Sequence, residues 1–279
     1  MRILVTNDDG YFSKGIETLA RIMRKFGDVT VVAPKYHQSG MSMAVTMGFK
    51  PIAVKQIRFG AEPWYYLDGT PASCVKFGID NVMTDARPDV VVCGINHGSN
   101  AASAALYSGT LGAAQEGAVN GIKAFGVSLD TFRTDADFSA VEALFPDIFT
   151  KIMENYPQEP GRFFNINFPN LKTSEIKGVR VASQGYVHWE DEYRLFDPGI
   201  YDKYGIIKEQ MGISAPPSPE PGEVLYMMAG DLTDNEGNPD DADHHLMEEG
   251  YVTVTAMSVD FTDRACNDSL KAAGLETDF

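Results

Sequence analysis

Residues 2–10 read RILVTNDDG, and this stretch decides how the first half of the chain is interpreted. Arg2 to Thr6 is a short, apolar, β-branched run, which is typical of a buried strand. Two adjacent carboxylates, Asp8 and Asp9, follow it directly. Apolar residues then recur at helical spacing from Ile16 to Phe26. The segment therefore predicts a strand, a polar turn and a helix in immediate succession.

The same alternation continues to about residue 130. It predicts a parallel sheet with helices on both faces, which is an α/β fold. Residues 41–53 and 64–67 are expected to form strands or a hairpin. The other elements expected here are strands at 28–34, 88–96 and 123–129 and helices at 71–82 and 110–121.

The second half is less regular. We expect a helix over 135–156, strands at 162–169 and 250–261, and a short helix in the tail from residue 267. Residues 179–230 mix short β-like runs with proline and glycine. The proline-rich stretch at 215–223 is expected to be a loop or an extended arm.

The net charge of −16 over 279 residues is unevenly distributed. Residues 1–130 carry a net charge of +1, whereas residues 231–279 carry −11. The acidic total argues against long nucleic acid or an anionic membrane as a partner, but the near-neutral first half need not repel a small anion. Three dispersed cysteines and the lack of a long apolar run or signal peptide favour a cytoplasmic protein.

Four polar clusters follow first-half strands or open the next helix. The carboxyl ends of parallel strands form the ligand crevice of an open sheet, so these clusters are expected to converge there. The clusters are Asn7–Gly10, Gln38–Gly40, Gly94–Gly98 and Tyr107–Thr110.

Asp8 and Asp9 would repel each other at a strand end unless a cation lay between them. The Ser39 hydroxyl and the Asn96 amide oxygen are further candidate ligands. Such an all-oxygen set suits Mg²⁺ or Mn²⁺ better than Zn²⁺, and we expect one divalent ion per subunit. The alternative is that Asp-Asp-Gly is only a turn with a helix cap.

Ser108, Gly109 and Thr110 open a predicted helix. Backbone N–H groups and the helix dipole make such a position a site for a phosphate, and the two hydroxyls add donors. The alternative is an ordinary Ser/Thr cap. His97 lies in the third cluster and could touch substrate, but a lone histidine on a loop is more often incidental, which is the interpretation preferred here. The pair His244-His245 has no third ligand at a recognisable spacing and is interpreted as solvated.

Taken in order, the motifs resemble the SurE (stationary-phase survival protein) family of metal-dependent nucleotidases. The resemblance covers about residues 1–262 and continues through FNINFP at 164–169 and GYVTVTAMSVDFT at 250–262. Its most specific stretches are ILVTNDDG (3–10), VVAP with QSG (31–40), GTPASCV (69–75), VVCGINHGSN (91–100) and YSGTLGAAQEG (107–117).

The resemblance implies hydrolysis of nucleoside 5′- and often 3′-monophosphates. It places the metal on Asp8, Asp9, Ser39 and Asn96, with both aspartates catalytic, and the phosphate on Ser108, Gly109 and Thr110. Asn100, which ends the VVCGINHGSN stretch, is grouped with the substrate-binding residues.

The resemblance also implies a Rossmann-like three-layer core with β extensions exchanged between the subunits of a homodimer or homotetramer. We therefore expect one domain over 1–279, with 1–130 as the metal- and phosphate-binding core. Residues 131–279 would complete that core and supply the β-rich extensions.

The sequence departs from the family pattern at a few positions. Ser73 stands where the family usually has Asp, Cys93 replaces a common Ser, and Ser103-Ala104 lacks acidic residues often found there. The attacking group stays open between a metal-bound water and a carboxylate. A non-catalytic nucleotide sensor is the main rival. A receiver-like signalling domain is disfavoured because the position of its phosphoacceptor Asp holds Cys93 to Asn96.

Overall fold

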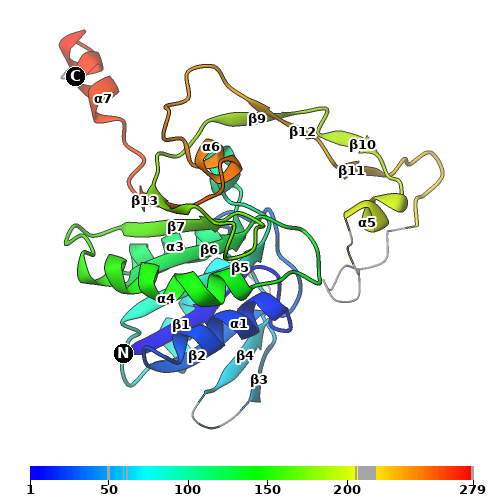
Figure 1. Cartoon of the computed structure of the whole chain (residues 1–279), viewed down its shortest axis with the longest axis vertical. Coiled ribbons are helices and arrows are strands. Elements are labelled where there is room, and N and C mark those ends of the chain that lie inside the picture. The colour runs from blue at the N-terminus through cyan, green and yellow to red at the C-terminus, as the bar shows by residue number, and fades with distance from the viewer. Residues whose placement is uncertain (49–50, 59, 61, 205, 207–217, 278–279) are drawn as a thin grey trace.

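A nine-stranded sheet forms the centre of the protein, which is described by a computed structural model over residues 1–48, 51–58, 60, 62–204, 206 and 218–277. The strand order is β3-β4-β2-β1-β5-β6-β7-β13-β8 (Figure 1). The strands are β1 (Arg2–Thr6), β2 (Asp28–Pro34), β3 (Val54–Arg58), β4 (Trp64–Leu67), β5 (Val90–His97), β6 (Lys123–Leu129), β7 (Arg162–Phe168), β8 (Gly178–Val181) and β13 (Tyr251–Ser258).

The six strands from β4 to β7 in this order run parallel. The direction reverses at each side, because β3 is antiparallel to β4 and β13 is antiparallel to β7. After β1 the chain builds outward through β2 and β4, and it then returns to β5 and builds the other way. The carboxyl ends of β1 and β5 therefore flank the switch point, where open α/β sheets bind ligands.

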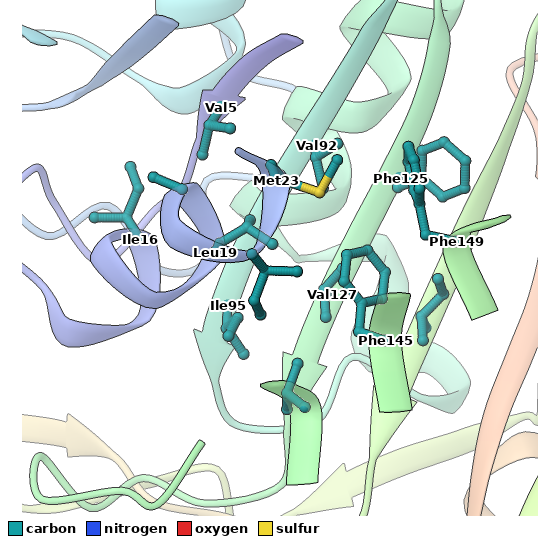
Figure 2. Close-up of a cluster of buried hydrophobic side chains, with 14 of the residues drawn as sticks. Val5, Ile16, Leu19, Met23, Val92, Ile95, Phe125, Val127, Phe145 and Phe149 are labelled. Carbon is teal, nitrogen blue, oxygen red and sulfur yellow. The ribbon is translucent and has the colours of Figure 1, made fainter. Parts of the chain in front are cut away.

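Helices cover both faces of this sheet, which confirms the α/β fold class. On one face lie α1 (Lys14–Met23) and α4 (Ser139–Glu154), and on the other lie α2 (Pro71–Phe77) and α3 (Gly109–Val119). Side chains alternate along β1, so Val5 packs under α1 whereas Leu4 faces the α2–α3 side. Figure 2 shows Met23 of α1 beside Val92 of β5, with Leu19 and Ile16 further along the same helix.

Beyond the sheet, a long two-stranded arm leaves the core (Figure 1). Its base pairs β9 (Val187–Glu190) with β12 (Asp231–Asp234), and its outer part pairs β10 (Tyr193–Leu195) with β11 (Tyr226–Met228). Near the outer end is α5 (Gly199–Tyr204). The short helix α6 (Asp243–Glu248) precedes β13, and α7 (Arg264–Ala272), which has no buried residue, lies apart from the core.

Several expected elements differ in detail. Residues 41–48 and 51–53 form no strand, and the edge strand begins at Val54. The helix expected at 71–82 is α-helical only to Phe77 and ends in a π-helical turn. Residues 218–223 lie in a loop, while 215–217 of the proline-rich stretch fall outside the described residues. Within the described part of the chain, no helix is long and apolar enough to cross a membrane.

Candidate metal and phosphate site

The turn after β1 places Asp8 and Asp9 inside the protein, where they are 2% and 1% exposed. The turn itself is held by the neighbouring Asn7, whose Nδ2 donates to the Ser13 hydroxyl at 2.8 Å. The same hydroxyl caps α1. Ser13, rather than Asp8 or Asp9, therefore caps the helix. Both aspartates are left available for another role.

Asp9 is held as a carboxylate by two histidines, His37 from the loop after β2 and His97 from the end of β5. His97 Nδ1 lies 2.9 Å from Asp9 Oδ2, and the His97 backbone N–H donates to the same oxygen at 3.2 Å. His37 Nδ1 lies 3.4 Å from Asp9 Oδ1. Burial alone would raise the pKa of Asp9, but the hydrogen bonds and charges of the two histidines lower it from 3.8 to about 2.

Asp8 has the opposite environment. Its burial raises its pKa, and the charge of Asp9 raises it further, to about 6. The Thr110 hydroxyl, which donates to Asp8 Oδ1 at 2.6 Å, works against this rise. Two neighbouring carboxylates with pKa values pushed apart are a common feature of catalytic and ion-binding sites.

Several buried oxygens in this region accept no hydrogen bond among the described residues. They include Oδ1 of Asn96, near the end of β5, and Oδ1 of Asp9, which the His37 ring approaches to 3.4 Å, as well as Thr6 Oγ1 and Asn7 Oδ1. The Asn96 amide is oriented by its Nδ2, which donates to the Gly98 carbonyl at 2.8 Å. Unpaired buried acceptors are costly, and a divalent cation satisfies carboxylate and amide oxygens together. The residues present therefore fit Mg²⁺ or Mn²⁺.

The N-terminus of α3 closes the other side of this crevice. The Ser108 hydroxyl accepts from the Leu111 N–H at 3.1 Å and caps the helix. A Cβ on Gly109 would come within 2.9 Å of the Asp8 Cβ, so the backbone approaches the carboxylates more closely than a side chain would allow. The start of the helix thus places N–H groups beside the aspartates, as anion binding requires.

Ser39 lies on the exposed loop after β2. The preceding Gln38 donates its backbone N–H to the Asp8 carbonyl at 2.7 Å, which brings the loop to the end of β1. Among the described residues, however, no hydrogen bond joins the Ser39 hydroxyl to either aspartate. The loop is held against α3 at Ser42, whose N–H donates to the Tyr107 carbonyl at 2.9 Å.

A family model described as "Survival protein SurE" matches residues 3–191. The chain belongs to the SurE family. It is 37% identical over 261 residues to the 5′-nucleotidase SurE of Cytophaga hutchinsonii, a match that covers 93% of this chain and 92% of that protein. Its identity to the 5′-nucleotidase SurE of Christiangramia forsetii is 36% over 264 residues, with the same coverage.

A solved structure, the SurE protein from Aquifex aeolicus, is similar over 98% of this chain and 100% of that one, with a TM-score of 0.74 and 30% identity. Together with the family match, this confirms both the resemblance seen in the motifs and the predicted α/β architecture. An exchange of extensions between subunits involves more than one chain and stays a prediction.

Asn100 is placed in a buried amide network within this SurE fold. Its Nδ2 donates to the Ser128 hydroxyl at 2.8 Å, and its N–H donates to Asn167 Oδ1 at 2.8 Å. Asn165 Nδ2 returns a bond to the Asn100 carbonyl at 2.8 Å. These bonds fix the 98–102 segment on the ends of β6 and β7, which gives Asn100 a positioning role in addition to any contact with substrate.

Sequence reasoning missed His37 and interpreted His97 as incidental. Both are site residues, because each lies against the buried Asp9. For His97 a signal was present, since it sits at the end of a buried strand inside a polar cluster. His37 gave no such signal, because it precedes the QSG motif on a loop whose path only the fold determines.

The residues that depart from the family pattern at Ser73, Cys93 and Ser103 are buried. The buried Ser73 hydroxyl accepts from the Thr46 N–H at 2.8 Å and lies 2.9 Å from the Thr70 hydroxyl. It therefore ties the loop before β3 to the start of α2. Cys74 and Cys93 are buried in the core, and burial raises the pKa of both thiols, so they are unreactive.

The interpretation of His244-His245 as solvated is wrong. His244 is 12% exposed at its side chain, and both rings contact Asp234, ten residues earlier in the chain. A ten-residue separation matches no familiar ligand spacing, so the sequence alone did not indicate that Asp234 lies beside the two histidines.

Proposed function

We propose that this chain is a divalent-metal-dependent 5′-nucleotidase that hydrolyses nucleoside 5′- and also 3′-monophosphates to nucleoside and phosphate. Family membership and the names of the relatives support this proposal. The observation that carries it is the pair of unpaired buried oxygens, on Asp9 and Asn96, beside the N-terminus of α3.

We assign Asp8, Asp9, Ser39 and Asn96 as ligands of one Mg²⁺ or Mn²⁺ per subunit. When bound, this ion would polarise a phosphate oxygen and lower the pKa of a water molecule. His37 and His97 keep Asp9 ionised, so that a negative ligand is available at neutral pH. Ser39 would complete the set through the loop that Gln38 and Ser42 hold in place.

The phosphate would lie at the start of α3. There the backbone N–H groups of Gly109 and Thr110 are directed at the crevice, as the first N–H groups of any helix lack intrahelical partners. The hydroxyls of Ser108 and Thr110 add donors for charge that develops on the phosphoryl oxygens. Asp8, with its raised pKa, is suited to orient the attacking water or to accept its proton.

A cavity of about 540 Å³ between the 99–104 segment and the arm is a candidate for the nucleoside. It is flanked by Ser99 and Ala101, on either side of Asn100, and by Phe132 after β6, and it continues to Trp189 on the arm. Apolar and aromatic walls of this kind suit a nucleobase, which would stack on a ring while the phosphate is held by α3.

The test is release of inorganic phosphate from a panel of nucleoside monophosphates, with and without Mn²⁺. We expect activity that EDTA removes and that Mg²⁺ or Mn²⁺ restores. Asp9→Asn should reduce the activity to background, whereas His188→Gln, on the exposed arm, should retain it. Nucleotide binding without phosphate release would instead identify a nucleotide sensor. An acid quench during turnover distinguishes the two routes, because aspartate attack would leave a phosphorylated enzyme and direct attack by water would not.

We further propose that the chain is one domain and that the arm and α7 join it to other subunits as a homodimer or homotetramer. The arm supports this, since it exposes apolar side chains that a monomer would leave in water, among them Tyr193, Leu195 and Tyr226. Light scattering of the purified chain would measure the assembly size. The cytoplasmic location and the absence of a nucleic-acid or membrane partner stay predictions.

A further inference from the structure

A second group of metal-ligating side chains lies away from the strand-end site, where the arm joins the core. Asp234 ends β12, the returning strand at the base of the arm, while His244 and His245 are consecutive residues of α6 (Figure 1). His244 Nε2 lies 3.1 Å from Asp234 Oδ1, and His245 Nε2 lies 2.7 Å from Asp234 Oδ2. All three ligand atoms fall within 4.8 Å of one another.

The two imidazole rings are arranged side by side, with centroids 4.1 Å apart and planes inclined at 43°. Both therefore present Nε2 to the same carboxylate although they are neighbours in sequence. Two histidines and one carboxylate form a nitrogen-rich set, which favours Zn²⁺ and similar transition metals over Mg²⁺. This preference is opposite to that of the all-oxygen set at the strand ends.

The second ring nitrogen of His244 supplies an independent observation. Nδ1 is buried without a hydrogen-bond partner among the described residues, and it lies 3.7 Å from Oδ1 of Asp243. The Asp243 carboxylate is fully buried, and its Oδ2 also has no partner in the described part of the chain. A metal-ligating histidine typically turns its other nitrogen to such a carboxylate, which fixes the tautomer and strengthens the ligand.

Access and charge agree with a bound cation. The side chains of His245 and Asp234 are 34% and 51% exposed, so an ion can enter and keep a water as a further ligand. The last 49 residues carry a net charge of −11, which raises the local concentration of cations. The three protein ligands would leave one position of a tetrahedral site open.

We propose that Asp234, His244 and His245 bind one Zn²⁺ ion, which fastens the base of the arm to α6. In this arrangement the ion joins β12 to the element that leads into β13 of the central sheet. The three ligands are different from the residues assigned to the strand-end metal, although His244 also lines the cavity proposed for the nucleoside. Occupancy of this second site would set how firmly the arm is held rather than the chemistry of hydrolysis.

The test is calorimetric titration of the full-length, metal-stripped protein with Zn²⁺ in excess Mg²⁺, which competes for the strand-end site. We expect one equivalent of Zn²⁺ in the wild type and in Asp9→Asn. His245→Gln and Asp234→Asn should each weaken this binding more than about 100-fold, because loss of a supporting partner alone costs about 10–100-fold. Both positions are partly exposed, so neither variant is expected to disturb folding.

His188→Gln is the matched control. His188 lies on the same arm, where its Nδ1 is 2.9 Å from Asn235 Oδ1, but it is outside the group of three. The His188→Gln variant should bind Zn²⁺ as the wild type does. The visible spectrum of the Co²⁺-loaded protein gives a second readout, since its ligand-field bands should disappear in His245→Gln and persist in Asp9→Asn. Zn²⁺ binding that Asp9→Asn removes and His245→Gln retains would overturn the proposal.

Discussion

Replacement of Asp8 by asparagine should stabilise the metal-free protein while it destroys activity. The buried Asp8 carboxylate lies beside another buried carboxylate, and its pKa is raised from 3.8 to about 6. At neutral pH the folded protein must therefore hold an unfavourable charge. Asparagine has the same shape, and its Oδ1 can still accept the Thr110 hydroxyl that now bonds to Asp8.

The magnitude follows from the pKa difference. The raised pKa means that the folded state binds the Asp8 proton more tightly than the unfolded state does. The stability that the bound proton provides is fully present below pH 3.8 and is lost as the pH rises through about 6. Each pKa unit is worth about 1.4 kcal/mol, so the ionised Asp8 costs about 3 kcal/mol at pH 7.5. Asp8→Asn should recover about this amount, or roughly 5–10 °C in Tm.

The assay is urea unfolding in EDTA at pH 7.5 and pH 4. The variant should exceed the wild type at pH 7.5, and the difference should shrink at pH 4, where Asp8 is protonated. With excess Mn²⁺ the order should reverse, because only the wild type gains stability from the ion. Asp8→Asn equal to or less stable than wild type in EDTA at pH 7.5 would refute the reasoning.

Asp9→Asn provides the matched control with the opposite sign. The lowered pKa of Asp9 contributes stability above pH 3.8 that is lost as the pH falls towards 2. The substitution removes the anion shared by His37 and His97, so it should destabilise the metal-free protein by about 2 kcal/mol at pH 7.5. The same isosteric change at adjacent positions thus separates the two environments.

Two further predictions concern α3. Gly112→Ala would place a Cβ 1.9 Å from the Ser42 carbonyl oxygen and displace the Gln38–Ser42 loop, so Mn²⁺ affinity measured by calorimetry should fall at least about tenfold. Gly117→Ala, on the same helix, meets only side chains at 3.1 Å or beyond, and unchanged affinity is expected there. Lys76→Met leaves the buried Glu116 without the ammonium now 2.8 Å away, which should cost about 1–3 kcal/mol in urea unfolding. An unchanged midpoint would show that water replaces the lysine.

Local pattern predicted the core of the fold well, because burial imposes a period on the sequence. The mainly apolar runs at 2–6, 28–34 and 123–129 are strands with those bounds, since a strand covered on both faces is apolar over most of its length. Residues 41–53 were misjudged. The described residues of this segment are exposed or only partly buried, and hydrogen bonds from Ser42 to Tyr107 and from Thr46 to Ser73 hold them as a loop rather than as a paired strand.

In the candidate site, too, the sequence indicated some residues and left the roles of others to the fold. The motifs predicted Asp8 and Asn96, at the ends of buried strands, and Thr110, at the start of a helix, and the structure brings Thr110 to Asp8. They did not indicate that Asn7 and Ser13 make the turn and cap, which frees the aspartates from that role.

By itself, the sequence determined the family, the parallel sheet and the oxygen-rich chemistry of the strand ends, since each depends on short motifs in order. Only the tertiary structure determined which ionisable groups lie close enough to interact. It brought His37 and His97 to Asp9, separated the pKa values of two adjacent aspartates, and placed Asp234 against His244 and His245. Electrostatic interactions depend on distance in space and on burial, and neither quantity is encoded in the spacing of residues along the chain.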